Sequence, residues 1–349
     1  MQNTHALLLP LLVLAGVFVG TARPAHAQAT DLAIHDPSTL LKQDNKTYWV
    51  FGTGRGIASF SSTDRVHWTF RAEVLPQSPD WVKEIVPGNR NNHLWAPDVI
   101  RVGDRYLLYY SASTFGSNVS AIGLATSKTL EPGSWTDQGV VIRSQRSDNF
   151  NAIDPAVIRT PEGKLYMSFG SFWSGIRMVE LDPATGKRLA PDAVPLALAA
   201  HPQDRANAIE APFIHYRDGY YYLFVNWDIC CRGPRSTYNI RVGRSKSVTG
   251  PYRDKTGMDL LRGGGTPLLD SRPDRGDGKP FDPKVGPGHA GILNDNGVDR
   301  FSFHYEYVRD NNGRSTLEIG TVQWGKTGWP RIVLAPTPAP PAKSANGVR

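Results

Sequence analysis

The chain has 349 residues, of which 40% are hydrophobic and 20% charged, and 39 Lys and Arg against 32 Asp and Glu give a formal net charge of +7. This composition excludes a disordered polyelectrolyte and a bundle of membrane helices. The basic residues are scattered and form no stripe, so we expect no nucleic-acid partner. Nine Trp, thirteen Tyr and thirteen Phe, together with 34 Gly and 27 Pro, favour an all-β protein with a large core.

The first 27 residues have the pattern of a targeting segment. Residues 6–20 form an apolar run, and the Ala25-x-Ala27 that follows fits a signal-peptidase site. A run of this length is short for a membrane span, so we expect cleavage rather than a retained anchor, and a chain that works in the periplasm or the medium. Residues 28–334 are expected to form one folded domain, and the Pro-rich residues 335–349 a disordered tail.

Between these ends the sequence repeats one unit five times. Each copy has a polar residue, a small residue or Pro, an aliphatic pair, a short polar turn and an aromatic-rich segment. The copies are anchored at Asp36, Asp98, Asp154, Glu210 and His289. Each copy predicts two strands joined by a tight turn, with further strands after it, as at residues 121–126 and 240–244. Five units of about four strands predict a five-bladed β-propeller, whose inner strands would bring the five anchors together at the axis.

The two cysteines of the chain, Cys230 and Cys231, are adjacent. They cannot connect distant parts of the fold, so its stability must come from the core. They fit either a vicinal disulfide that stiffens a loop or a pair of free thiols. A metal site built on them alone is not expected, because there is no second cysteine pair.

Three of the anchors are carboxylates followed by Pro or by Ala-Pro: Asp36, Asp154 and Glu210. One such residue alone fits an ordinary turn, but three in an internal repeat indicate a site. Clustered carboxylates raise one another's pKa, which keeps one of them protonated near neutral pH. Glycoside hydrolysis needs this division, because one carboxylic acid protonates the leaving oxygen while an ionised carboxylate activates water or attacks carbon.

Aromatic residues near the predicted axis could offer flat apolar faces to sugar rings. The candidates are Trp95, Phe172 and Trp173. Packing between blades explains each of them at least as well.

At these residues the sequence resembles glycoside hydrolase family 43 and, within it, the endo-α-1,5-L-arabinanases. The resemblance extends from His35 to about Trp324. The motifs that carry it are Trp95-Ala-Pro-Asp98, Asn151-Ala-Ile-Asp154-Pro155, Gly170-Ser-Phe-Trp-Ser-Gly175, Ile209-Glu210-Ala-Pro212 and Gly286-Pro-Gly-His289. The segments Cys230-Cys231-x-Gly233 and Gly263-Gly-Gly-Thr266 resemble the arabinanase branch in particular.

The resemblance implies a role for each anchor. Asp36 would be the general base, Glu210 the general acid, and Asp154 the residue that tunes and orients the acid. The family inverts configuration, so the two working carboxyl groups should lie about 6.5–9.5 Å apart. Asp98 is interpreted as a supporting residue. The implied substrate contacts are Asp36, Gly116, Asn151, Asp154, Ser171, Phe172 and Trp173.

The resemblance also implies a calcium ion at the axis, held by His289 largely through water, and no organic cofactor. A hydrogen-bonding role for His289 is the alternative, because calcium ordinarily takes a cage of oxygen ligands. Ala290 and Gly291 follow where related sequences often carry a polar residue. The long loop 270–286 could reshape the cleft.

These features together imply a secreted, monomeric endo-arabinanase that cuts internal α-1,5 links of pectic arabinan by single displacement. An exo-acting relative stays open as the alternative, whether an α-L-arabinofuranosidase, a β-xylosidase or an exo-arabinanase, because one loop that blocks the groove would make that change. A sugar-binding propeller without activity is disfavoured, since all three carboxylates are present.

Overall fold

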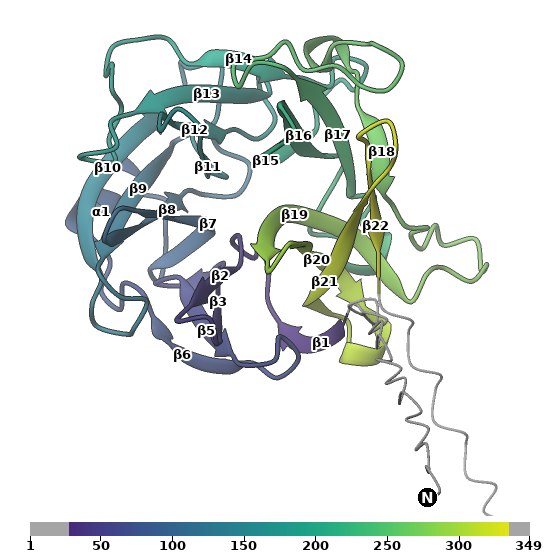
Figure 1. Ribbon diagram of the computed structural model, residues 1–349, viewed down its shortest axis with the longest axis horizontal. Helices are drawn as coiled ribbons and strands as arrows, with labels where there is room; N and C mark the ends of the chain where they lie inside the picture. Colours follow the sequence, from purple (N-terminus) through teal and green to yellow (C-terminus); the bar gives the residue numbers. More distant parts are fainter. Residues whose placement is uncertain (1–27, 335–349) are drawn as a thin grey trace, which may run out of the picture.

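Five antiparallel sheets are arranged as blades around a central axis in the computed structural model, which describes residues 28–334 (Figure 1). The predicted all-β, five-bladed β-propeller is confirmed. The predicted signal peptide, residues 1–27, and the predicted tail, residues 335–349, lie outside the described residues. In the described range the one α-helix is α1 (Asp80–Ile85), and no helix there is long and apolar enough to cross a membrane.

The blades follow one another along the chain, each with its first strand nearest the axis (Figure 1). Blade one contains β2 (Leu41–Gln43), β3 (Thr47–Gly52), β5 (Ala58–Ser62) and β6 (Thr69–Glu73). Blade two contains β7 (His93–Val102), β8 (Arg105–Ala112), β9 (Ser120–Ser127) and β10 (Thr136–Ser144), with β4 (Gly54–Arg55) paired to β7. Blade three contains β11 (Ala156–Arg159), β12 (Leu165–Phe169), β13 (Ile176–Leu181) and β14 (Leu196–Ala199). Blade four contains β15 (Ile209–Arg217), β16 (Tyr220–Trp227), β17 (Asn239–Ser245) and β18 (Thr266–Leu269). Blade five contains β19 (Lys284–Asp295), β20 (Val298–Val308), β21 (Arg314–Trp324) and β22 (Pro330–Val333).

The last blade is completed by both ends of the described chain. Strand β1 (Gln28–Ala33) pairs with one part of β21, and β22 pairs with the remainder. The end of β19 also contacts blade one, because Asp295 accepts hydrogen bonds from Lys42 (2.7 Å) and Tyr48 (2.8 Å). Strand pairing and this ion pair therefore close the ring between its first and last blades.

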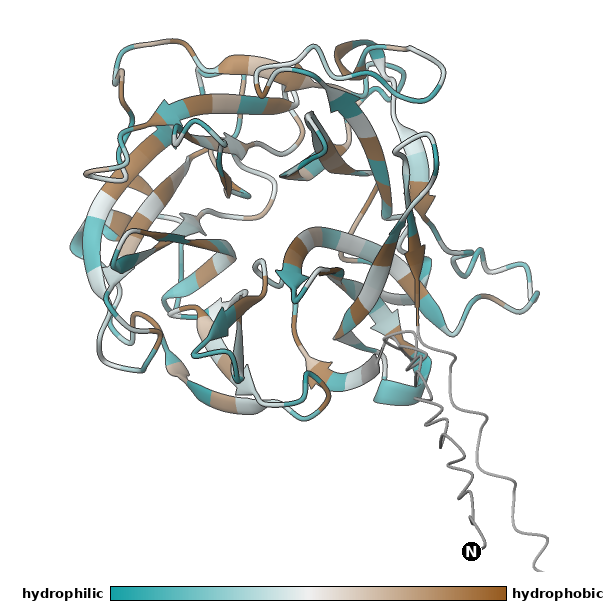
Figure 2. Cartoon of the chain, in the orientation of Figure 1, coloured by the Kyte–Doolittle hydropathy of each residue, from teal (hydrophilic) through white to brown (hydrophobic). Residues whose placement is uncertain are grey.

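The hydrophobic core lies largely between neighbouring blades. Hydrophobic and hydrophilic residues alternate along many strands, as expected where successive side chains point to opposite faces (Figure 2). Phe224 of blade four, for example, packs against Phe301 of blade five with ring centroids 5.7 Å apart, and both rings are fully buried.

The backbone adopts a left-handed conformation once per blade beside the axis. The five positions are Asp36 (φ 48°), Ala96 (43°), Asp154 (57°), Ala211 (49°) and His289 (61°). In blades two, four and five the strand register shifts at this point, which is the mark of a β-bulge. Aligning the blades on this left-handed residue therefore changes the alignment of the five copies that the sequence predicted. Asp98 lies two residues after the equivalent position, and Glu210 lies one residue before it.

This offset gives Asp98 a role different from that of the other anchors. Its side chain is buried, with Oδ1 accepting a hydrogen bond from the Thr39 backbone N–H (3.1 Å) and Oδ2 one from that of Val157 (2.9 Å). Asp98 therefore links blade two to the inner segments of blades one and three. This is the supporting role that the sequence predicted for it.

Replacing Asp98 by alanine should destabilise the propeller. The substitution leaves two buried backbone N–H groups without acceptors, and each such loss costs about 1–3 kcal/mol, so we expect the free energy of unfolding to fall by about 2–5 kcal/mol. Denaturant unfolding measures this change. Asp104→Ala is the matched control, since Asp104 lies exposed in the turn of the same blade. Equal stability of the two variants would contradict a bridging role for Asp98.

Candidate active site

One end of the axis opens into a cleft of about 990 Å³. Every residue that the sequence predicted to contact substrate lines this cleft, and so does Glu210. The predicted set is Asp36, Gly116, Asn151, Asp154, Ser171, Phe172 and Trp173. The blades thus bring together residues that lie far apart in the sequence.

Asp36 is held by side chains from blades one and five. His35 Nδ1 lies 2.8 Å from Asp36 Oδ2, and the Thr53 hydroxyl donates to the same oxygen at 2.5 Å. His289 Nδ1 lies 3.5 Å from Oδ1, and the Asp36 backbone N–H donates to His304 Nδ1 at 2.9 Å. Burial opposes ionisation of Asp36, but the charge of His35 and the hydrogen bonds from His289 and His35 hold its pKa well below the usual range. Asp36 is therefore an ionised carboxylate.

Asp154 and Glu210 have the opposite electrostatic environment. Burial, reinforced by the negative charges of Glu210 and Asp36, raises the pKa of Asp154 well above its ordinary value. Burial also raises the pKa of Glu210, although hydrogen bonds from Ser171 and Tyr238 oppose this shift. The Ser171 hydroxyl donates to Glu210 Oε2 at 2.5 Å. Burial thus favours the protonated forms of Asp154 and Glu210, whereas the partners of Asp36 favour its ionised form.

The cleft walls carry groups that suit a sugar chain. Asn151 is buried, and its Oδ1 has no hydrogen-bond partner among the described residues, which leaves an acceptor for a ligand. Phe172 (φ 55°) and Trp173 (φ 42°) are consecutive residues in the left-handed region, which costs each about 1–3 kcal/mol. Trp173 is 39% exposed, so this strained loop presents an aromatic ring to the cleft instead of burying it.

The sequence alone did not identify several residues of the cleft. Phe115 is 81% exposed and lines the cleft, and its place in a polar segment beside the predicted contact Gly116 was a signal for this. Tyr238 follows shortly after the Cys230-Cys231-x-Gly233 segment that carries the family resemblance, and His35 directly precedes Asp36, so both offered a signal. Glu306 offered none, because it follows a run of buried aromatic residues in β20.

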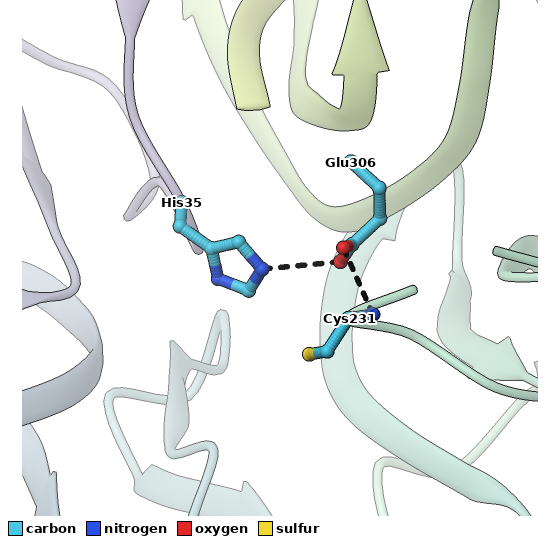
Figure 3. Close-up of side chains that lie close together, drawn as sticks. All are labelled: His35, Cys231 and Glu306. Carbon is cyan, nitrogen blue, oxygen red and sulfur yellow. Dashed lines mark hydrogen bonds and ion pairs between the residues drawn. The ribbon is translucent and has the colours of Figure 1, made fainter. Parts of the chain in front are cut away.

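Cys230 and Cys231 form a vicinal disulfide that lines the cleft. The alternative of two free thiols is thereby resolved in favour of the disulfide. The Cys231 backbone N–H donates to Glu306 Oε2 at 2.9 Å, so the cysteine loop is tied to blade five at the edge of the cleft (Figure 3).

The donor groups around His289 are few for a calcium site. Calcium takes six to eight oxygen ligands, whereas the described residues provide one imidazole with Asp36 beside it. His289 Nε2 makes no hydrogen bond to a described residue, so one ring nitrogen is available. The residues fit a cation held through one histidine and mostly by water, and they do not form a protein cage.

Two tight groups of potential metal ligands lie nearby, but their atoms have other partners. His35, Asp36 and His304 form one group, and His35, Cys231 and Glu306 the other. The imidazoles and carboxylates hydrogen-bond to one another, and the Cys231 sulfur is in the disulfide. Among the described residues, the donor atoms of these two groups are therefore already paired with one another.

Cleavage of a glycosidic bond requires one carboxylate that accepts a proton and one that gives it. A propeller that places both kinds in one axial cleft lined with aromatic rings defines the class as glycoside hydrolases. The model of the Glycosyl hydrolases family 43 matches residues 31–330. The chain belongs to this family, as the sequence motifs predicted.

Relatives of the chain include one enzyme named as endo-acting and one named as exo-acting. The extracellular endo-α-(1->5)-L-arabinanase 1 of Bacillus subtilis is 42% identical over 90% of this chain and 94% of its own. The extracellular exo-α-(1->5)-L-arabinofuranosidase ArbA of Cellvibrio japonicus is 39% identical over 87% of each chain. Among solved structures, the family 43 endo-arabinanase of Bacillus licheniformis superposes with a TM-score of 0.78 at 43% identity, covering 88% of this chain and 99% of that one.

Proposed function

We propose that this glycoside hydrolase is a secreted endo-arabinanase that hydrolyses internal α-1,5 links of L-arabinan with inversion. The observation that carries the proposal is the pairing, in one cleft, of ionised Asp36 with the proton-holding pair Asp154 and Glu210. The name of the Bacillus subtilis relative supports the substrate and the internal cut.

In the proposed mechanism, Glu210 donates its proton to the glycosidic oxygen as the bond to the anomeric carbon breaks. Asp36 removes a proton from a water molecule that attacks the same carbon from the opposite face, so the product has inverted configuration. Asp154, whose own pKa is raised by burial and by the charges of Glu210 and Asp36, would tune and orient the acid Glu210. The separation of about 6.5–9.5 Å between the two working carboxyl groups stays a prediction.

The size of the cleft favours binding of several sugar rings. Its volume of about 990 Å³ is at the upper end of the range for sites that enclose a drug-sized ligand. Phe115 and Trp173 supply exposed rings along it. An exo-acting enzyme is the second candidate, because the Cellvibrio japonicus relative is named as one at similar identity.

Secretion is part of the proposal. The names of the relatives from Bacillus subtilis and Cellvibrio japonicus describe them as extracellular, which supports the predicted signal peptide over residues 1–27. Arabinan side chains of pectin would then be the natural polymer, reached by a monomeric enzyme outside the cell.

The product profile on debranched linear arabinan tests the proposed function. An endo-enzyme should release a spread of oligosaccharides early, with a rapid fall in viscosity, because it cuts at internal links. Chromatographic sizing over time, with viscometry on the same samples, provides the measurement. A single small product from the first time point would assign an exo-enzyme, and no cleavage would remove arabinan as the substrate.

Alanine at either working carboxyl group should abolish most of the activity. We expect kcat to fall at least about 10²–10⁴-fold in both Glu210→Ala and Asp36→Ala, with oligosaccharide binding retained. A substrate with a good leaving group distinguishes the two roles, because its departure needs no proton. Glu210→Ala should recover much of its loss on an aryl arabino-oligosaccharide, whereas Asp36→Ala should not. Near-full activity of either variant would refute its assigned role.

The pH dependence of kcat/KM should be bell-shaped. Activity falls as the pH drops through the pKa of Asp36, because the base becomes protonated, and as it rises through the pKa of Glu210, because the acid loses its proton. The lowered pKa of Asp36 and the raised pKa of Glu210 widen the active range on both sides. Ser171→Ala removes a hydrogen bond that lowers the pKa of Glu210, so the alkaline limb should move to higher pH while the acidic limb stays. A shift of the alkaline limb to lower pH would contradict this assignment.

A calcium ion at His289 stays a prediction, in which the bound cation would add positive charge near the base. A ligand that binds only the folded state adds about 2.7 kcal/mol to the free energy of unfolding at 100 times its Kd, and the melting temperature rises accordingly. Chelation should therefore lower the melting temperature or the activity, and added Ca²⁺ should restore it. His289→Ala should remove the response to calcium. Identical behaviour before and after chelation would exclude a functional ion.

A further inference from the structure

His35 lies between two carboxylates. Its Nε2 is 3.1 Å from Glu306 Oε1 (Figure 3). Its Nδ1 is 2.8 Å from Asp36 Oδ2. An ionised carboxylate only accepts hydrogen bonds, so both ring nitrogens of His35 must donate. The geometry therefore requires an imidazolium at His35, with one ring nitrogen on the base and the other on Glu306.

A second histidine connects the same two acids by a different route. The Asp36 backbone N–H donates to His304 Nδ1 at 2.9 Å, so this nitrogen carries no proton. The proton must be on Nε2, which lies 3.2 Å from Glu306 Oε1 and donates to it. The ring of His304 is fully buried and stacks on that of His35, with centroids 4.5 Å apart. Glu306 thus fixes the tautomer of one histidine and the charge of the other.

Glu306 is itself firmly held. Its side chain is 3% exposed, and Oε2 accepts the Cys231 backbone N–H at 2.9 Å. Burial opposes its ionisation, but the hydrogen bonds and charges of His304 and His35 lower the pKa of Glu306 to about 2. Glu306 is therefore a fixed negative charge with partners on both oxygens, and no atom of it is available to react.

We propose that Glu306 is a positioning residue, which acts through His35 and His304 to hold Asp36 in the orientation that accepts a proton from water. His35 and Thr53 both lie on Asp36 Oδ2, at 2.8 and 2.5 Å, whereas Oδ1 has the more distant His289 Nδ1 at 3.5 Å, so Oδ1 is the oxygen more open to water. This inference rests on the proposed role of Asp36 as the base. It adds a function for a glutamate on the last blade that no sequence motif marks.

The first test is Glu306→Gln, which keeps the shape of the side chain but cannot hold the imidazolium. Loss of a group that orients a catalytic histidine or metal ligand costs about 10–100-fold or more, so we expect kcat on a defined arabino-oligosaccharide to fall about 10–100-fold. KM should stay within about threefold, because Glu306 does not extend to the substrate. Glu318→Gln is the matched control, since Glu318 is equally buried on the neighbouring strand β21 and pairs with Lys284. Its kcat should equal that of the wild type. An unchanged kcat in Glu306→Gln would overturn the proposal.

A double-mutant cycle separates positioning from general destabilisation. His35 is partly exposed, so His35→Gln should fold, and a comparable fall in kcat in this single variant keeps the proposal testable if Glu306→Gln does not fold. If the two residues act as one unit, the double variant should be no slower than the worse single variant. Losses that multiply would mean independent effects and would overturn the proposal.

Histidine NMR provides a readout that is independent of substrate. With ¹⁵N-labelled histidine, and with His35→Gln to assign the signals, both ring nitrogens of His35 should be protonated at neutral pH in the wild type. Glu306→Gln should remove one of these protons, whereas Glu318→Gln should not. A neutral His35 in the wild type would overturn the proposal. Failure of the wild type to cleave arabinan would instead refute the proposed function, and the spectra would still decide whether Glu306 holds His35.

Discussion

Several carboxylates are buried around the single axis of the propeller, and the structure depends on how each of these negative charges is stabilised or neutralised. A buried negative charge is stable only if it finds donors or gives up its charge. Asp98 finds two backbone N–H groups, and Asp36 and Glu306 find histidines. Asp154 and Glu210 have weaker donors and lie beside other acids, so their pKa values rise. The difference between these solutions separates acids that favour the ionised form from acids that favour the protonated form within one small region.

The propeller delivers these acids to the cleft through a local departure from regular strand geometry. Side chains in a strand alternate between two faces, so one extra residue in a bulge redirects those that follow. The left-handed residue beside the axis occurs in every blade, but its side chain differs: an aspartate in blades one and three, an alanine in two and four, and a histidine in five. The same backbone device thus produces a chemically asymmetric site. Glu210 reaches the cleft from the position before the bulge, and Asp98, two residues after it, is directed into the core.

We expect the walls of the cleft, and not the carboxylates, to decide the mode of cleavage. Relatives named as endo- and exo-acting enzymes have similar identity to this chain, so membership of the family does not distinguish the two modes. The walls consist of loops between strands, where exposed Phe115, the strained pair Phe172–Trp173 and the disulfide of Cys230 and Cys231 meet. Loops tolerate change without loss of the core, and a single loop can therefore open or block one end of a groove.

The sequence by itself determined the all-β class, the five blades and the residues that converge in the cleft. These follow from local patterns, because each hairpin has its own turn and its own hydrophobic alternation, and five copies reinforce one signal. It placed Asp36, Asp154, Glu210 and the predicted substrate contacts correctly in one cleft. It misaligned Asp98 and Glu210 within the repeat, because a bulge shifts the register without a residue type that marks it. Only the tertiary structure decided that Glu306 faces His35 and His304, and which acid is ionised. Those properties depend on burial and on contacts between blades one, four and five, which are distant in sequence and leave no local trace.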